Sequence, residues 1–320
     1  MLRHYLTPSL TLVALAGMAS SACKSSDSAA KDAALADSAA VYEKESGMFR
    51  KVGETPNLQG PESARYDRDL DVWFVSNING TPLQKDNNGY ISRLRPDGTP
   101  YSLKFIEGGK KGVTLNAPKG LAINGDTLWV ADIDVARAFN KRTGELIANV
   151  STKARFLNGA AVGPDGAVYM TDTGVLFGPK GEFSHPGPDQ VFRITRGGAK
   201  PALTSAKLEG PNGITWDPQQ KRFVIVSFLG KGIYGWKPGD KDIESLGSGP
   251  GQQDGVVFLP DGRLLATSWT DSSLFVLEHG QARKVAAKVP SPADIDVEPK
   301  DSRVAVPLLM ENRVEFWEIQ

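Results

Sequence analysis

Short apolar runs of β-forming residues recur along the chain, and each follows a similar polar turn. The clearest copy reads Pro211-Asn212-Gly213-Ile214-Thr215-Trp216: a turn residue, one polar side chain, a glycine and a β-prone run. The polar positions of the six copies are Glu62, Lys119, Asn158, Asn212, Asp254 and, in a degenerate copy, Ala293 next to Asp294. Successive positions are separated by 57, 39, 54, 42 and 39 residues. Repeats of about 40 residues with several strands each are typical of β-propeller blades, so six blades are predicted.

A second β-prone run follows each copy after a turn. These runs cover residues 72–76, 127–131, 167–171, 222–227, 263–268 and 303–307. In a propeller the first strand of each blade lies nearest the axis, and the second strand returns to the same face. The six polar positions are therefore expected to converge at one mouth of the central channel. Asn77, Asp132 and Asp172 are expected near its rim, as substrate-binding candidates.

Two long loops, 78–89 and 173–190, are expected on this face, and the second carries Phe177 and Phe183. Long loops in a compact domain are typical of lids or binding loops. The six Trp and most of the Phe residues fall on strands and are predicted to pack between blades. The glycines that follow four of the polar positions are predicted to allow close backbone approach where blades crowd together.

The last repeat provides only three strands before the chain ends, at residues 294–297, 303–307 and 313–319. A β-prone stretch at residues 48–54, ahead of the first repeat, is predicted to supply the fourth. This pairing would leave no long unpaired sheet edge between the two ends of the ring. The sequence therefore predicts an all-β, six-bladed propeller over residues 46–320, with its last blade closed by an N-terminal strand.

Charge and cysteine content exclude several functions. Lys plus Arg and Asp plus Glu both number 37, so no basic surplus is present to neutralise the phosphates of a nucleic acid. Cys23 is the only cysteine, which excludes an intramolecular disulfide and a thiolate metal site. No sequence feature indicates oligomerisation, and a monomer that acts on a small molecule is expected.

The first residues read as a secretory signal. A basic start precedes a short apolar run at residues 10–18, followed by small residues up to Cys23. Cys23 after Ser21-Ala22 resembles the lipobox of bacterial lipoproteins, which predicts a signal peptide at 1–22 and a lipidated flexible tether at 23–45. The expected location is the cell envelope or periplasm, with membrane contact only through the lipid anchor. A plain signal peptide and a secreted protein are the alternative.

The converging side chains suggest a metal centre. Carboxylate and amide oxygens are hard ligands, which suit Ca²⁺ best among the candidates, with Mg²⁺, Mn²⁺ and Zn²⁺ as other possibilities. Lys119 is the unexpected member of the ring. Its ammonium group is predicted either to pair with Glu62 or Asp254 and plug the channel, or to stabilise a developing oxyanion.

The repeats resemble the gluconolactonase/regucalcin family, also called the senescence-marker-protein family, from about Gly60 to the C-terminus. The motifs that carry the resemblance are Glu62-Ser63, Arg155-Phe156-Leu157-Asn158-Gly159, Pro211-Asn212-Gly213-Ile214-Thr215-Trp216 and Asp254-Gly255. Leu157 is an extra residue relative to the family's Arg-aromatic-Asn run.

The resemblance implies roles for these residues. Glu62, Asn212 and Asp254 would hold the metal, and Asp254 would also act as general base. Asn158 would contact the substrate or the attacking water, and Arg155 would steer the substrate. Members of the family hydrolyse sugar lactones and related esters with a divalent ion, so a metal-dependent hydrolase is predicted. The alternative is a non-catalytic ligand- or protein-binding propeller with a channel plugged by Lys119.

Overall fold

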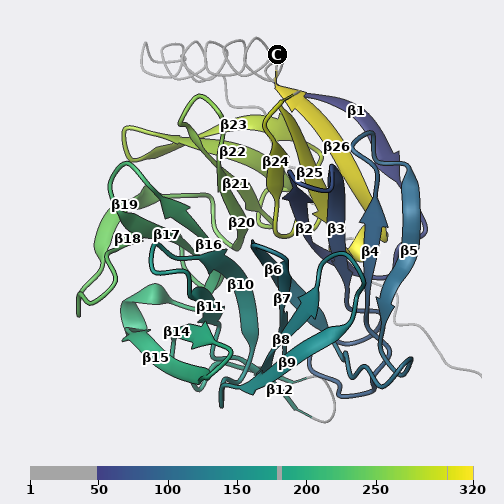
Figure 1. Cartoon of the computed structure of the whole chain (residues 1–320). Coiled ribbons are helices and arrows are strands. Elements are labelled where there is room, and N and C mark those ends of the chain that lie inside the picture. The colour runs from purple at the N-terminus through teal and green to yellow at the C-terminus, as the bar shows by residue number, and fades with distance from the viewer. Residues whose placement is uncertain (1–48, 179–181, 301, 320) are drawn as a thin grey trace, which may run out of the picture. The chain divides into compact units, whose positions relative to one another are not determined.

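The computed structural model describes residues 49–178, 182–300 and 302–319. The predicted signal peptide at 1–22 and tether at 23–45 lie outside these residues. The described strands form six four-stranded antiparallel blades around a central axis (Figure 1). Within the described part of the chain, no helix has the length and apolar character needed to cross a membrane.

Blades 1 to 3 follow one another along the chain. Blade 1 contains β2 (Pro61–Asp67), β3 (Val72–Asn77), β4 (Tyr90–Leu94) and β5 (Pro100–Glu107). Blade 2 contains β6 (Pro118–Asn124), β7 (Thr127–Asp132), β8 (Val135–Asn140) and β9 (Leu146–Ser151). Blade 3 contains β10 (Leu157–Val162), β11 (Val168–Asp172), β14 (Gln190–Thr195) and β15 (Gly198–Thr204), with a hairpin of β12 (Leu176–Phe177) and β13 (Phe183–Ser184) inserted after β11.

Blades 4 to 6 complete the ring. Blade 4 contains β16 (Pro211–Asp217), β17 (Arg222–Ser227), β18 (Gly232–Trp236) and β19 (Glu244–Ser248). Blade 5 contains β20 (Gln253–Phe258), β21 (Leu264–Ser268), β22 (Ser273–Glu278) and β23 (Gln281–Ala287). Blade 6 contains β24 (Asp296–Glu298), β25 (Arg303–Leu308), β26 (Arg313–Ile319) and β1 (Phe49–Thr55). Two short 3-10 helices, η2 (Ala206–Leu208) and η3 (Leu309–Glu311), lie between strands.

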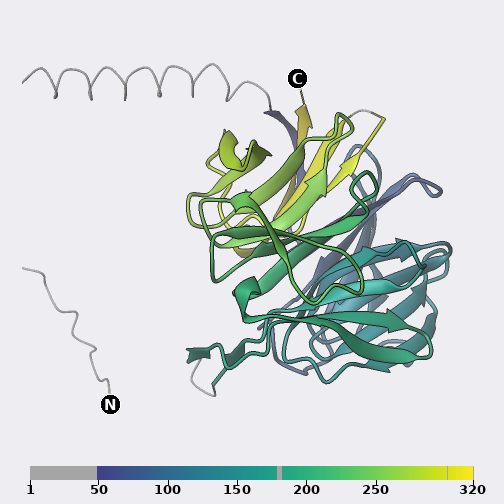
Figure 2. The ribbon, with the colours of Figure 1, turned by 90° about the vertical axis from the view of Figure 1, so that its left-hand side faces the viewer.

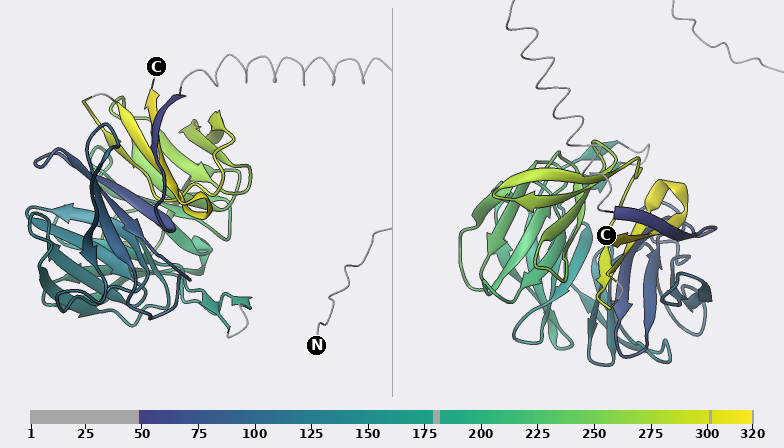
Figure 3. Two further views of the ribbon diagram at one scale, coloured as in Figure 1. Left: turned by 90° about the vertical axis from the view of Figure 1, so that its right-hand side faces the viewer. Right: turned by 90° about the horizontal axis from the view of Figure 1, so that it is seen from above.

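The predicted closure of the ring is confirmed. β1 pairs antiparallel with β26, in a register that runs from Phe49 opposite Ile319 to Thr55 opposite Val314. The two strands lie side by side next to the C-terminal end (Figure 3). The pairing covers the edge of β26, which would otherwise present unpaired backbone groups to solvent.

The apolar core is divided among the spaces between blades. Six buried clusters each combine side chains from two neighbouring blades, and together they cover every junction of the ring, including that between blades 6 and 1. Middle strands such as β3 and β7 are buried at every position because their two faces pack on different neighbours. Outer strands such as β5 expose about half of their residues. This explains why the middle strands read as continuous apolar runs.

A β-bulge interrupts the innermost strand of blades 1 to 5 where the polar residue stands. The registers shift at Glu62, Lys119, Asn158, Asn212 and Asp254. Bulges re-aim side chains at the rims of sheets. The glycines that follow the polar residues have the predicted role, because the backbones of neighbouring blades approach closely there. A Cβ on Gly213 would lie 2.3 Å from the carbonyl oxygen of Asp254, and one on Gly120 would lie 2.2 Å from that of Asn158.

Two long connections cover the same end of the ring. The hairpin β12–β13 projects away from the blades, as the side views show (Figures 2 and 3). The 78–89 loop is instead tied down on blade 2, where Asn87 Oδ1 accepts a hydrogen bond from the Leu115 amide at 2.9 Å and Lys85 pairs with Asp134 at 2.7 Å. Both connections contribute to one cavity.

Candidate functional site

The five polar residues at the bulges meet in one cavity at the mouth of the channel. Glu62, Lys119, Asn158, Asn212 and Asp254 all line it, and none of them is more than 4 % exposed. The cavity measures about 620 Å³. The convergence that was expected from the repeat spacing is therefore present for five of the six blades.

The sixth blade contributes no polar side chain to the ring of bulge residues. Ala293 is fully buried at the equivalent place. The neighbouring Asp294 is used elsewhere: its Oδ2 accepts hydrogen bonds from Ser63 Oγ at 2.6 Å and from Arg65 Nη2 at 3.0 Å. These bonds tie blade 6 to blade 1.

Four buried oxygen atoms in the cavity have no hydrogen-bond partner among the described residues. They are Glu62 Oε2, Asn158 Oδ1, Asn212 Oδ1 and Asp254 Oδ1, from blades 1, 3, 4 and 5. A buried polar atom without a partner costs about 1–3 kcal/mol, so such atoms are rare and call for an explanation. Four acceptors around one cavity, two of them on carboxylates, fit the hard oxygen donor set of a divalent cation.

The orientation of the Asn158 amide follows from its neighbours. Its Nδ2 donates to Thr173 Oγ1 at 3.1 Å, and that hydroxyl in turn donates to the Pro211 carbonyl at 2.8 Å. The amide nitrogen is thereby occupied, and Oδ1 is the atom left as an acceptor. Among the described residues, no three His, Cys, Asp or Glu side chains gather to hold a metal. A cation here therefore requires the amide oxygens as well as the two carboxylates.

The two carboxyl groups are poorly suited to carry charge without a cation. Burial raises the pKa of Glu62 well above its ordinary value, and the carboxylates of Asp254 and Asp294 raise it further, while Lys119 offsets part of the rise. Burial likewise raises the pKa of Asp254 well above its ordinary value, with a further contribution from Asp294. Trp269 and Asn212 lie close enough to Asp254 to offset part of this rise. A bound cation favours the charged form of both groups.

Lys119 is held by the backbone, not by a carboxylate. Its Nζ donates to the Pro82 carbonyl at 2.9 Å and to the Ala117 carbonyl at 3.0 Å, and it lies 4.3 Å from the centre of the Phe156 ring. Burial lowers the pKa of Lys119 to about 8, and the charge of Glu62 opposes the change. No ion pair within 4.0 Å joins Lys119 to an acidic group of the described residues. The direct pairing that the plugged channel requires is thus missing from the described structure.

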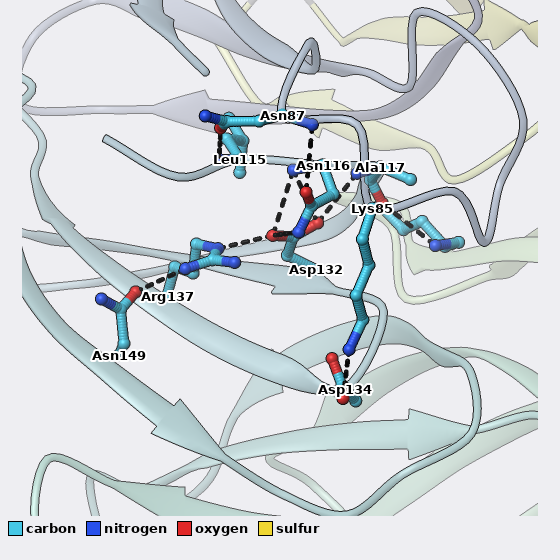
Figure 4. Close-up of polar contacts among 10 residues, drawn as sticks. Lys85, Asn87, Leu115, Asn116, Ala117, Asp132, Asp134, Arg137 and Asn149 are labelled. Carbon is cyan, nitrogen blue, oxygen red and sulfur yellow. Dashed lines mark hydrogen bonds and ion pairs between the residues drawn. The ribbon is translucent and has the colours of Figure 1, made fainter. Parts of the chain in front are cut away.

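The expected rim residue Asp132 has a structural role (Figure 4). Its carboxylate accepts hydrogen bonds from the backbone amides of Asn116 and Ala117 and from Arg137 Nε at 2.5 Å. It therefore fixes the turn that leads into β6, and it does not line the cavity.

The three other residues expected to bind substrate also lie outside the cavity lining. Asp172 accepts from the backbone amides of Arg155, Phe156 and Gly174. Asn77 donates to the Val75 carbonyl and to Ser92 Oγ. The Arg155 side chain is exposed and donates to the Gly187 carbonyl at 2.5 Å. Asp172 and Asn77 thus support the rim through their hydrogen bonds.

The residue that follows the second strand forms the wall instead. Five such residues line the cavity: Ile78 after β3, Thr173 after β11, Phe228 after β17, Trp269 after β21 and Leu309 after β25. Successive side chains of a strand point to opposite faces, so a shift of one residue exchanges a rim-supporting position for a cavity position. The prediction that all six Trp residues pack between blades was wrong for Trp269, which lines the cavity. Its place directly after the second strand of blade 5 is the signal that was available.

Comparison with known proteins identifies the fold. No protein-family model and no curated protein matches the sequence significantly. A catalytically inactive virginiamycin B lyase from Staphylococcus aureus with quinupristin matches with a TM-score of 0.57 at 13% identity, over 85% of this chain and 99% of that one. A proposed gluconolactonase matches with a TM-score of 0.62 at 15% identity, over 85% of this chain and 92% of that one. The chain is thus a six-bladed β-propeller that resembles both in structure at low sequence identity.

Proposed function

We propose that this protein is a divalent-metal-dependent hydrolase of a lactone or related ester. The observation that carries the proposal is the set of four unpaired oxygen atoms that four separate blades direct to one cavity. Their two carboxylates supply the charge that balances a divalent ion, and Ca²⁺ is the ion that the set suits best. The likeness to propeller enzymes is consistent with this function.

The residues divide into an ion-holding group and a reacting group. Glu62, Asn212 and Asp254 would hold the ion. A bound divalent ion supplies Lewis acidity toward a carbonyl oxygen and toward water. Asp254 would accept the proton of the attacking water, and Asn158 Oδ1 would orient that water by accepting a hydrogen bond.

The position of Lys119 suits a role in stabilising negative charge on the substrate. Two of its three N–H groups are used on the carbonyls of Pro82 and Ala117, and the third has no partner among the described residues. A buried cation fixed in the cavity can stabilise negative charge that develops on the substrate without reorganising during the reaction. Its pKa, lowered to about 8, leaves the group cationic at neutral pH.

Metal content and turnover test the proposal together. After exhaustive dialysis, elemental analysis is expected to find one divalent ion per chain, which Glu62→Gln loses. Asp254→Ala is expected to abolish hydrolysis of a panel of lactones and esters while the circular dichroism spectrum is unchanged. Asp261→Ala is the matched control, because it removes a more exposed carboxylate from the same blade.

Each alternative gives a different result in this experiment. A chain that retains no metal and turns over no ester, yet is folded, is a non-catalytic binding propeller. Undiminished turnover by Asp254→Ala rejects the mechanism. Reaction in water enriched in heavy oxygen separates hydrolysis, which incorporates the label into the acid product, from an elimination, which does not.

The cellular location is a separate proposal that rests on the residues around Cys23 alone. We propose a lipid anchor there, which holds the propeller in the cell envelope as a monomer that acts on a small molecule. Cys23→Ala is expected to move the protein from the membrane fraction to the soluble fraction. Unchanged membrane association of that variant would reject the anchor.

A further inference from the structure

The upper wall of the cavity is strongly apolar, in contrast to its polar floor. The same cavity that the five bulge residues line is also lined by large apolar side chains: Ile78, Phe156, Phe177, Phe183, Phe228 and Trp269. Large cavities lined by aromatic side chains, with a few polar groups at one end, are typical of sites for mainly apolar small molecules. A volume of about 620 Å³ lies within the range for drug-sized ligands.

The aromatic rings of the wall form two groups. In blade 3, Phe177 lies between Phe156 and Phe183, with ring centres 6.5 Å and 5.7 Å apart. Across blades 4 and 5, Phe228 and Trp269 meet edge to face at 5.8 Å. These distances are those of favourable aromatic contacts, so each group presents a preorganised surface to a flat or bulky apolar group.

Several of these side chains are left in contact with solvent at the cavity mouth. Phe177 is 42 % exposed, Phe183 is 52 % exposed, and Met310 on the opposite side is 68 % exposed. A cluster of exposed large apolar side chains at a cavity mouth marks a ligand site. Covering this surface removes apolar area from water, which favours binding of an apolar substituent.

The wall offers little to a charged or polyhydroxylated ligand. Glu62, Lys119 and Asp254 are the only charged residues among the described lining, and all three belong to the floor. The polar wall residues are few, and two of them each use one side-chain atom within the chain: Asn79 Nδ2 donates to the Asn88 carbonyl, and Asn312 Oδ1 accepts from the Gly60 amide. Gln59 and Thr81 are exposed, and Trp269 Nε1 is the one buried wall donor without a partner among the described residues. A ligand with many hydroxyl groups would therefore bury polar atoms without partners.

We propose that the substrate is a neutral lactone or ester with an aromatic or bulky aliphatic substituent, which packs against these aromatic groups while the ester reaches the floor. This inference rests on the proposed function and narrows it. In the reaction, the oxygen of water bonds to the acyl carbon and the acyl C–O bond breaks. One proton of the water passes by way of Asp254 to the leaving alkoxide oxygen, which gives an acid and an alcohol.

The test compares three lactones with the Ca²⁺-supplemented full chain: δ-valerolactone, a phenyl-substituted δ-valerolactone and gluconolactone. The kcat/KM value is expected to be ten- to a hundredfold higher for the phenyl compound than for the unsubstituted one, since each buried methylene contributes about fourfold. Gluconolactone is expected to be the poorest substrate. A phenyl-substituted lactam, which is not hydrolysed, is expected to raise the melting temperature more than the unsubstituted lactam does.

Variants of the hairpin residues test whether the cavity mouth causes the preference for the phenyl-substituted lactone. Phe183→Ala and Phe177→Ala are expected to lower the ratio of kcat/KM values for the phenyl and unsubstituted lactones by about three- to tenfold each. Tyr101→Ala is the matched control, because this exposed aromatic residue lies on β5, the outer strand of blade 1, and not in the cavity lining. It is expected to leave the ratio unchanged.

The two proposals fail in different ways. A preference for gluconolactone, or equal kcat/KM values for the three compounds, overturns this inference and leaves the hydrolase proposal standing. Hydrolysis of no lactone or ester overturns both. An unchanged substrate ratio in both phenylalanine variants shows that the hairpin does not bind the substituent and also overturns the inference.

Discussion

Substitution of Glu62 by Gln is expected to make the metal-free protein more stable. The Glu62 side chain is 4 % exposed, and its Oε2 has no hydrogen-bond partner among the described residues. Its pKa lies well above the ordinary value because of burial and the nearby Asp254 and Asp294 carboxylates. Gln keeps the shape but removes the charge. A residue that lowers the stability of the fold at its own position is typical of a binding site, whereas a residue with a structural role raises the stability.

The size of the effect follows from the cost of an unpaired buried group. That cost is about 1–3 kcal/mol. The buried amide of Gln also lacks a full set of partners and keeps part of this cost, so the free energy of unfolding is expected to rise by about 1–2 kcal/mol. Domains of 150–250 residues shift in melting temperature by about 2–4 °C per kcal/mol. The ring is slightly larger, and an increase of about 2–5 °C is therefore expected for Glu62→Gln in the presence of a chelator.

Thermal unfolding with chelator and with excess Ca²⁺ measures this change. The parent is expected to gain about 2.7 kcal/mol at a hundredfold excess of ion over Kd. Glu62→Gln is expected to gain much less because one of the two charged ligands is gone. The order of stability therefore reverses: the variant is more stable with chelator, and the parent is more stable with Ca²⁺. Asp261→Asn, a more exposed carboxylate in the same ring, is expected to leave both values unchanged.

Two results would refute the reasoning. If Glu62→Gln melts below the parent in chelator, the carboxylate stabilises the fold and its unpaired oxygen is not a strained ligand. If Ca²⁺ raises the melting temperature of parent and variant equally, Glu62 does not hold the ion.

Three further predictions follow from the same region. Gly213→Ala is expected to lower the melting temperature by several degrees, because the added Cβ would lie 2.3 Å from the Asp254 carbonyl oxygen, and an unchanged value would contradict the close packing of neighbouring blades. Between pH 8 and 10.5 the parent is expected to gain stability relative to Lys119→Met in urea unfolding. The folded protein, in which the pKa of Lys119 is about 8, binds fewer protons there than the unfolded chain, and a flat difference would show that burial does not lower this pKa. Deletion of residues 46–54 is expected to lower the melting temperature of the whole ring in calorimetry, because β26 loses one of its two partners and becomes an unpaired edge, and a parent-like transition would show that β1 is dispensable.

The architecture could be predicted from local patterns because each blade repeats the same short sequence motif. A turn, one polar residue and a β-prone run recur at Glu62 and at Asp254 alike, and the deficit of one strand in the last repeat indicated the closure that β1 provides. The glycines were also predictable, since Gly213 stands where two backbones have to approach. A turn followed by a β-prone run is a property of neighbouring residues, so no tertiary information was needed.

The details of the site depended on contacts between distant segments. Asp132 and Ile133 are neighbours, yet Asp132 supports a turn and Ile133 packs in an apolar cluster with Ile78. The position of each residue at the end of β7 decides which role it has. The backbone carbonyl of Pro82, 37 residues away, takes the ammonium of Lys119 that was expected to pair with a carboxylate.

The sequence by itself determined the six-bladed ring, its closure and the five polar residues that meet at the channel mouth. Only the tertiary structure decided that four of their oxygens have no partner and that aromatic side chains from three blades stand above them. Strand formation depends on residues that adjoin along the chain. The contents of a cavity depend on which side chains the bulges and loops of separate blades bring together in space.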